Sequence, residues 1–192
     1  MIAQVAQVGQ SILAEYAKIP IAFEVREVLA VVREPSPGSP IHLEPRAIAM
    51  PWVKDYDAID GGPLSWPTRF DLTHWTFFVA RVQERLVGAA AVVYPARDAS
   101  MLTGRADVVP IWDLRVAPDA RRHGVGRALM DTIEAWARAH EASWLEVETQ
   151  DINAPACRFY AACGFELRAA TRDAYPELPN ETQLLWYKRL RG

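Results

Sequence analysis

The sequence predicts a single mixed α/β domain, and three stretches of the chain carry this prediction. Residues 107–116 form an apolar run that leads through a proline-marked turn into an amphipathic stretch over residues 124–140. Residues 143–149 form a second apolar run, followed by a short helical stretch. Residues 74–83 and 86–94 predict two strands of a hairpin. At 192 residues the chain is long enough to bury a substantial core.

The chain begins with a stretch that has helical periodicity. We expect an amphipathic helix over residues 2–19, as an extension of residues 1–20 that precedes a domain of residues 21–192. The apolar residues that share one side of this helix are Ile2, Val5, Ile12, Leu13 and Tyr16.

The next segments have weaker patterns. Residues 21–33 predict a strand, which a loop rich in proline, glycine and serine closes. Residues 42–56 predict helical pieces, because Pro45 and Pro51 interrupt the run. Residues 61–67 predict a loop.

The second half of the chain alternates more regularly. Residues 107–116 and 143–149 predict strands, and residues 124–140 predict the long helix between them. Two further strands are expected near residues 165–170 and 183–190.

Whole-chain properties exclude several classes of protein. The net charge of −3 gives no reason to expect nucleic acid as a partner. No apolar run reaches the roughly 20 residues that span a bilayer, and the N-terminus lacks signal-peptide order. Cys157 and Cys163 would lie about 9 Å apart on one helix, too far for a disulfide. The four histidines show no metal-ligand spacing. We therefore expect a cytoplasmic protein without a metal and without membrane attachment.

A glycine-rich turn before the long helix is the strongest functional signal. Gly124 and Gly126 stand where the first backbone N–H groups of a helix have no intrahelical partner and the helix dipole is positive. Such a corner binds pyrophosphate groups readily. Nearby cationic side chains add formal charge. They are Arg121, Arg122 and Arg127. We expect a phosphate-bearing cofactor here.

Two other interpretations of this turn are open. The glycines could serve packing alone, which would leave the arginines without a role. The turn could also belong to a dinucleotide-binding fold, because Glu146 lies twenty residues beyond Gly126. That fingerprint needs its first glycine at the strand end, whereas seven residues separate Val116 from Gly124 here. Leu129 stands where its third glycine should be.

The pattern Arg121-x-x-Gly124-x-Gly126 resembles motif A of the GNAT acyl-CoA-dependent N-acetyltransferases. A second stretch, Asn-x-x-Ala-x-x-Phe-Tyr-x-x-x-Gly-Phe from Asn153 to Phe165, is similar to the motif B region of the same family. An ordinary short helix would explain much of this second stretch, but not its pairing with motif A at this distance.

Local signals also support a helix in the motif B stretch. Asn153 is a good N-cap, Pro155 fits the first turn, and Gly164 suits the position after the helix end. On this helix we expect Tyr160 to be exposed.

The resemblance implies the GNAT fold, with a central mixed, mostly antiparallel sheet flanked by helices, and acetyl-CoA as the acetyl donor. In that family the asparagine position commonly touches the pantetheine arm, and the tyrosine commonly stands near the thioester sulfur. These roles fall on Asn153 and on Tyr160, the expected general acid. The expected cofactor-binding residues are Leu114, Arg115, Val116, Arg121, Arg122, His123, Gly124, Val125, Gly126, Arg127, Asn153 and Tyr160.

Transfer to an amine also requires a proton acceptor, because an amine with a pKa near 10 has roughly one molecule in a thousand unprotonated at neutral pH. Strand alternation places Asp113 and Arg115 on one face. Acidic residues recur in the family at the position of Asp113, and Glu148 on the next strand is the alternative base. Either acid could instead be solvated or pair with an arginine. The backbone from Leu114 to Val116 could bind pantetheine amides as an added strand.

Other short sequence segments narrow the resemblance to streptothricin acetyltransferase-like members. This narrower resemblance covers the chain from about residue 22 onward. These segments include Glu148-Thr149-Gln150-Asp151 and the terminal Leu185-Trp186-Tyr187. That group acetylates an amine on the β-lysine part of the antibiotic. A polycationic acceptor suits carboxylates and aromatic faces, although loop acids are often solvated and aromatic residues often belong to the core. The expected acceptor-binding residues are Asp55, Asp57, Asp60, Trp66 and Tyr175.

We therefore predict an acetyl-CoA-dependent N-acetyltransferase that acts on a primary amine of a small cationic acceptor, such as a streptothricin-type antibiotic. Neither cysteine stands at an evident acetyl-accepting position, which favours direct transfer in a ternary complex. The alternative from another class is a non-catalytic acyl-CoA-binding sensor or partner module. The resemblance also implies a homodimer as a family-level expectation.

Overall fold

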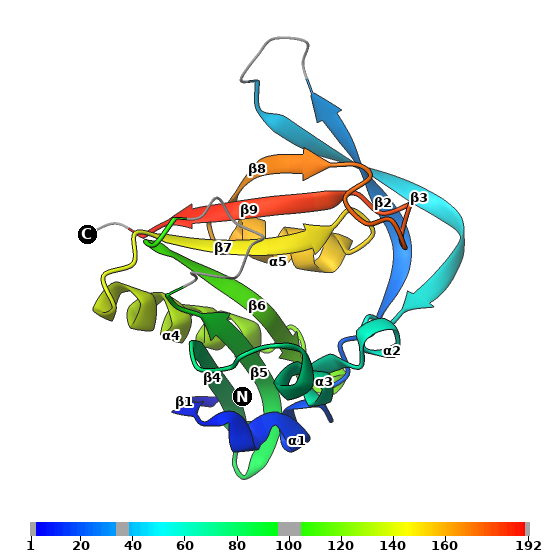
Figure 1. The fold of residues 1–192 in the computed structure, drawn as a ribbon. Helices are drawn as coiled ribbons and strands as arrows, with labels where there is room; N and C mark the ends of the chain where they lie inside the picture. The colour runs from blue at the N-terminus through cyan, green and yellow to red at the C-terminus, as the bar shows by residue number, and fades with distance from the viewer. Residues whose placement is uncertain (1–2, 34–38, 96–104, 191–192) are drawn as a thin grey trace. The chain divides into compact units, whose positions relative to one another are not determined.

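The computed structural model describes residues 3–33, 39–95 and 105–190 (Figure 1). The chain divides into two compact units. The first unit comprises Met1–Ala22, Asp55–Leu145 and Leu190–Gly192, and the second comprises Phe23–Lys54 and Glu146–Arg189. Each unit is therefore built from stretches that are distant in the sequence.

The first unit contains four neighbouring strands in the order β1 (Gln4–Val8), β4 (Trp75–Val82), β5 (Arg85–Val93) and β6 (Val108–Val116). All three pairings are antiparallel. β5 is buried over most of its length because both faces of this sheet are covered. Apolar and small residues of β5 therefore occupy the centre of the sheet.

One face of this sheet carries α4 (Val125–Ala139), which contacts β4, β5 and β6 (Figure 1). The helix buries an apolar side that includes Leu129, Met130 and Ile133. It approaches β5 closely at Gly88, where a Cβ atom would lie 2.9 Å from Val125 Cγ1. This close approach fixes the start of α4 against the sheet.

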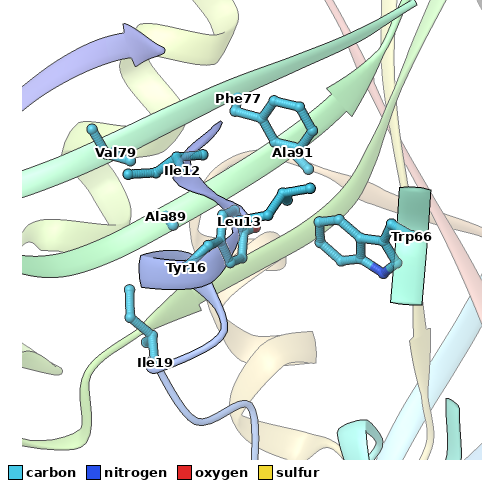
Figure 2. Close-up of a cluster of buried hydrophobic side chains, with 9 residues drawn as sticks. All are labelled: Ile12, Leu13, Tyr16, Ile19, Trp66, Phe77, Val79, Ala89 and Ala91. Atoms are coloured by element: carbon cyan, nitrogen blue, oxygen red, sulfur yellow. The ribbon is translucent and has the colours of Figure 1, made fainter. Parts of the chain in front are cut away.

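The other face is covered by a buried aromatic and aliphatic cluster (Figure 2). It joins the short helices η1 (Gln10–Ile12) and α1 (Leu13–Tyr16) to α3 (Gly62–Arg69), which follows α2 (Asp57–Asp60). Tyr16 and Trp66 pack edge to face with ring centroids 5.5 Å apart. Such burial of large side chains is the main stabilising contribution on this face.

The second unit contains a long hairpin, β2 (Phe23–Arg33) and β3 (Ile41–Lys54), and three strands in the order β7 (Trp144–Gln150), β9 (Gln183–Arg189) and β8 (Glu166–Thr171). α5 (Ala154–Ala162) contacts β2. A backbone hydrogen bond from Leu29 N to Asp151 O, 2.8 Å long, ties the hairpin to the end of β7.

The predicted mixed α/β class is confirmed, as are the hairpin of β4 and β5, the strands β2, β6, β7, β8 and β9, and the helices α4 and α5. No helix in the described ranges is long and apolar enough to cross a membrane. The assignment of residues 1–20 to a separate extension stays a prediction.

Three local predictions are wrong. The helix expected over residues 2–19 is instead β1 followed by η1 and α1, because residues 4–8 pair with the edge of β4. The helical pieces expected over residues 42–56 are β3, an edge strand that tolerates Pro45 and places Pro51 at an irregularity in the pairing. The loop expected over residues 61–67 is α3, which has Pro63 in its first turn.

Candidate functional site

The turn between β6 and α4 has the backbone geometry of an anion site. It contains η2 (Pro118–Ala120), then Arg122 with φ 63° and Gly124 with φ 84°. Gly124 is the N-cap of α4, and no side chain caps this helix. A Cβ atom on Gly124 would meet no atom within 4 Å, so the space beside it is open. The first-turn N–H groups of α4 therefore adjoin a space that a pyrophosphate could enter.

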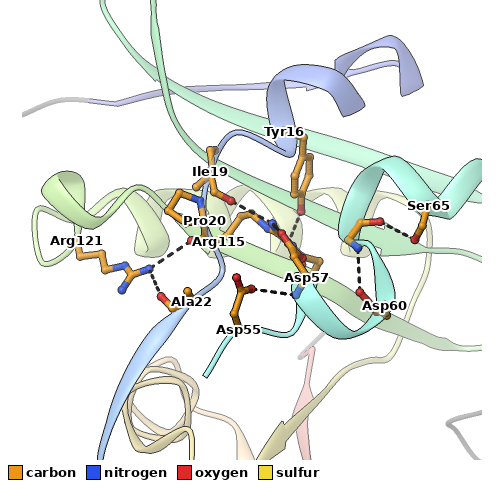
Figure 3. Close-up of polar contacts among 12 residues, drawn as sticks. Tyr16, Ile19, Pro20, Ala22, Asp55, Asp57, Asp60, Ser65, Arg115 and Arg121 are labelled. Carbon is orange, nitrogen blue, oxygen red and sulfur yellow. Dashed lines mark hydrogen bonds and ion pairs between the residues drawn. The ribbon is translucent and has the colours of Figure 1, made fainter. Parts of the chain in front are cut away.

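The arginines of this turn have different roles. Arg121 is half-buried, and its Nε donates to Val116 O at 3.0 Å. Its guanidinium also donates to Pro20 O at 3.5 Å and to Ala22 O at 3.3 Å (Figure 3). Arg121 thus holds the turn and the N-terminal segment in place. Its predicted contact with a phosphate stays a prediction.

The exposed cations at the turn are Arg122 and Arg127. Arg127 Nε lies 2.8 Å from the Asp131 carboxylate, in an exposed pair. Arg122 has no ion-pair partner within the described ranges, which makes it the cation most available to an anion. His123, also exposed, contacts Arg121 O through Nδ1 at 2.8 Å.

Asp113 and Arg115 share one face of β6, as predicted, and both are buried. Arg115 binds Asp113 through Nε at 3.0 Å and Nη2 at 2.6 Å. The Tyr16 hydroxyl donates to Asp113 Oδ1 at 2.6 Å. Arg115 Nη1 donates to Asp57 Oδ2 at 2.7 Å and to Ile19 O at 3.1 Å (Figure 3). Burial alone would lower the pKa of Arg115, but the carboxylates of Asp113 and Asp57 outweigh it and raise that pKa.

This network favours the structural alternative for Asp113, because both carboxylate oxygens already accept hydrogen bonds. Its role as proton acceptor stays a prediction that the geometry does not support. Asp57, expected to bind the acceptor, shares the same arginine. Asp55 Oδ1 accepts from Asp57 N at 3.1 Å and holds the start of α2. Trp66, also expected to bind the acceptor, is only 3% exposed within the core cluster.

We expect Asp113→Asn to lower the free energy of unfolding by about 3 kcal/mol, because it leaves the buried Arg115 charge with one carboxylate fewer. Urea unfolding measures this loss. Asp119→Asn is the matched control, since its pair with Arg85 is exposed and screened by solvent, so this variant should unfold as the wild type does. If Asp113→Asn kept full stability and lost turnover, Asp113 would be the proton acceptor after all.

The second unit carries the other predicted base. The Glu148 carboxylate accepts hydrogen bonds from the Tyr175 hydroxyl and from Gln183 Nε2, the latter at 2.7 Å. Gln150 Nε2 donates to the Tyr175 oxygen at 3.1 Å. Burial, and then the charge of Glu148, raise the pKa of Tyr175. Both oxygens of Glu148 thus accept hydrogen bonds. Tyr175, which was predicted to bind the amine acceptor, donates one of them.

Glu146 is the acid that sequence reasoning missed as a candidate base. It lies two residues before Glu148 on β7, so the two side chains share a face. Glu146 is 1% exposed, and among the described residues neither carboxylate oxygen has a partner within hydrogen-bonding geometry. Burial raises the pKa of Glu146 to about 8; Tyr187 opposes this shift, and the charge of Glu148 adds to it. An acid inside a buried apolar strand was the available signal.

α5 presents the motif B residues. Asn153 is its N-cap, as predicted, and its Oδ1 accepts from Ala156 N at 3.2 Å. Tyr160 was expected to be exposed, but it is 6% exposed. This expectation is wrong because Tyr160 packs edge to face against Phe159 and Phe165. Burial raises the pKa of Cys157 to about 11, so this cysteine is a thiol at neutral pH.

The acids of β7 suit proton transfer, and the turn before α4 suits anion binding. Within the described ranges, no group of three or more His, Cys, Asp or Glu residues is arranged to hold a metal ion. Asn153 and Tyr160 belong to the second unit, whereas Leu114, Arg115, Val116 and the residues of the glycine turn belong to the first.

Residues 48–165 match the sequence profile of the Acetyltransferase (GNAT) family. The chain belongs to this family. Both the resemblance inferred from motifs A and B and the fold it implied are thereby confirmed.

Relatives within the GNAT family include streptothricin acetyltransferases. Streptothricin acetyltransferase A of Bacillus subtilis (strain 168) is 42% identical over 79 residues, which cover 40% of this chain and 46% of that protein. The chain thus spans about half the length of the streptothricin acetyltransferases it matches. The [ribosomal protein bS18]-alanine N-acetyltransferase of Escherichia coli (strain K12) is 30% identical over 137 residues, covering 70% of this chain and 78% of that protein.

The fold is shared with solved GNAT proteins. A structure described as a streptothricin acetyltransferase from Bacillus anthracis, in complex with acetyl coenzyme A, has a TM-score of 0.79 at 19% identity. The match covers 98% of this chain and 99% of that one. Nourseothricin acetyltransferase has a TM-score of 0.75 at 23% identity, with full coverage of both chains.

Proposed function

We propose that this protein is an N-acetyltransferase that moves the acetyl group of acetyl-CoA to a primary amine of a small cationic acceptor of the streptothricin type. The observation that carries the proposal is the open space beside Gly124, at the uncapped start of α4. Backbone N–H groups of Gly124, Val125 and Gly126 would hold the pyrophosphate there. The relatives that acetylate streptothricin support the choice of acceptor.

The reaction we propose is a direct transfer. The amine nitrogen attacks the thioester carbonyl, the bond from nitrogen to the acetyl carbon forms, and the C–S bond breaks. The proton of the acceptor ammonium passes to Glu146, whose raised pKa of about 8 suits a base at neutral pH. Tyr160 gives a proton to the leaving thiolate and regains one from the attacking nitrogen, which loses its second proton as the amide forms. Because Cys157 is a protonated thiol, a covalent acetyl-cysteine route is disfavoured.

We further propose Tyr175 and Glu148 as contacts of the cationic acceptor, since they combine an aromatic ring with a carboxylate. A cytoplasmic location, a homodimer, and the absence of metal, membrane and nucleic-acid partners remain part of the proposal. The buried cysteines suit a reducing compartment, and the net charge of −3 does not favour nucleic acid.

The test is a thiol-release assay with acetyl-CoA and a panel of amines. The panel contains streptothricin, polyamines, aminoglycosides and a peptide with a free N-terminus. We expect release of coenzyme A with streptothricin at a rate well above the rate without acceptor. Tight acetyl-CoA binding without turnover on any amine would instead indicate a non-catalytic acyl-CoA-binding module.

We expect Tyr160→Phe to reduce turnover about tenfold or more while the affinity for acetyl-CoA stays within about twofold, because the ring still packs and only the proton donor is lost. Steady-state kinetics and calorimetric titration measure the two effects. Tyr94→Phe in the first unit is the control and should change neither. Unchanged turnover in Tyr160→Phe would remove Tyr160 as the general acid.

A further inference from the structure

A cavity of about 460 Å³ lies within the second unit, and the proposed reaction does not use it. Its walls come from β2, β3, β8 and the segments beside β7 and β9. Its described lining residues include three arginines and one acid, among apolar and small residues. The charged ones are Arg33, Arg46, Arg172 and Asp151. The volume lies in the range of small-molecule sites.

The arginines of this cavity are poorly neutralised. Arg33 donates from Nη2 to Ala170 O at 2.9 Å, and among the described residues no carboxylate pairs with it. Arg46 and Arg172 are exposed, and neither has an ion-pair partner within the described ranges. Asp151 is the one acid among the lining residues that the structure describes. Three guanidinium groups against one carboxylate leave a local excess of positive charge in a chain whose net charge is negative.

The walls of the cavity are held by hydrogen bonds. Asp151 exchanges two of them with Thr182, through Asp151 N to Thr182 O at 3.1 Å and through Thr182 N to Asp151 Oδ1 at 3.0 Å. Leu29 N donates to Asp151 O at 2.8 Å, and Arg33 binds Ala170 O on β8. These contacts hold β2 against the end of β7 and against β8. The backbone walls of the site are therefore preformed, which lowers the entropy cost of binding.

We propose that this arginine cavity is a binding site for a small polyanion that carries two or more phosphate or carboxylate groups. The planar guanidinium fork binds both groups bidentately. A ligand with at least two negative charges neutralises the positive charge of the arginines that Asp151 does not compensate. Its anionic groups contact Arg46 and Arg172, while the apolar wall from β2 accommodates its carbon frame.

The proposal is tested by isothermal titration of the whole protein at constant ionic strength, with pyrophosphate and with citrate as separate probes. We expect saturable binding of at least one probe with a Kd of about 1 mM or tighter. The stronger probe identifies the preferred group, phosphate or carboxylate. The double variant Arg46→Gln/Arg172→Gln should bind that probe at least tenfold more weakly.

Two control variants separate this cavity from other cationic places. Arg168→Gln removes an exposed arginine on β8 that pairs with Glu166 and does not line the cavity, so it should bind the probe as the wild type does. Gly124→Glu should also retain the probe, because it alters only the turn before α4. The proposal is wrong if neither probe saturates, if Arg168→Gln loses as much affinity as the double variant, or if Gly124→Glu alone removes binding.

Discussion

Gly124→Glu is expected to lose acetyl-CoA binding by roughly a thousandfold while the protein still folds. The new side chain would extend into open space rather than into the core, because a Cβ atom at this position meets no atom within 4 Å. Its carboxylate would stand at the start of α4, where the pyrophosphate is expected. Two unit charges about 4 Å apart interact by about 4 kcal/mol at an effective dielectric constant of 20. Calorimetric titration with acetyl-CoA measures the loss.

Backbone strain is the competing explanation, since Gly124 has φ 84° and a side chain there costs about 1–2 kcal/mol. Gly164→Glu is the matched control. Gly164, after α5, has the same φ of 84°, and its Cβ would lie 3.7 Å from Lys188 Cε, an ordinary contact. We expect this variant to lose similar stability and to keep its affinity for acetyl-CoA within about twofold. Normal binding by Gly124→Glu would show that the pyrophosphate lies elsewhere.

Elements whose signals are local could be predicted from the sequence. α5 begins at its Asn153 cap and ends before Gly164, and both positions follow from the geometry of helix ends. The hairpin of β4 and β5 follows from the strand periodicity of both segments and from a pair of polar residues at the turn between them. The turn at Gly124 was located because its glycines and arginines stand together in the chain. In each case the deciding contacts lie within a few residues.

Elements that depend on distant contacts could not be predicted. Residues 4–8 became β1 because the edge of β4, about seventy residues away, offered backbone partners. The buried network around Asp113 could not be foreseen, because the Tyr16 hydroxyl that binds its carboxylate lies 97 residues away in the sequence. Periodicity cannot show such pairings, since it describes one segment at a time.

Glu146→Gln is expected to reduce turnover with the amine acceptor by about a hundredfold or more, because amide nitrogen and oxygen cannot take the ammonium proton at neutral pH. In the wild type, kcat/KM should rise with pH and inflect near pH 8, where the Glu146 carboxyl loses its proton. The variant should lack this inflection and keep only the rise that belongs to the amine itself. Stopped assays across pH 5.5–9.5 would resolve the two profiles.

Glu148→Gln on the same strand is the matched control, because Glu148 already accepts hydrogen bonds from Tyr175 and Gln183. It should keep the inflection near pH 8, while the loss of charge beside the cationic acceptor should raise the acceptor KM. An inflection that persists in Glu146→Gln, or that disappears only in Glu148→Gln, would assign the proton to Glu148.

The stability of the wild type and of Glu146→Gln gives a second readout that does not depend on activity. An exposed carboxyl of this type titrates near 4.5, whereas burial raises the pKa of Glu146 to about 8 in the folded protein. Between these values the folded protein holds one proton more than the unfolded chain, so its stability falls as pH rises through this window and levels off above it. The loss is at most about 5 kcal/mol, at 1.36 kcal/mol for each pH unit.

Because glutamine does not titrate, Glu146→Gln should gain stability relative to the wild type between pH 5 and pH 8.5, as measured by urea unfolding. A difference in stability that does not change with pH would mean that Glu146 is ionised in the folded protein at neutral pH, and the proposed base would lose its physical basis.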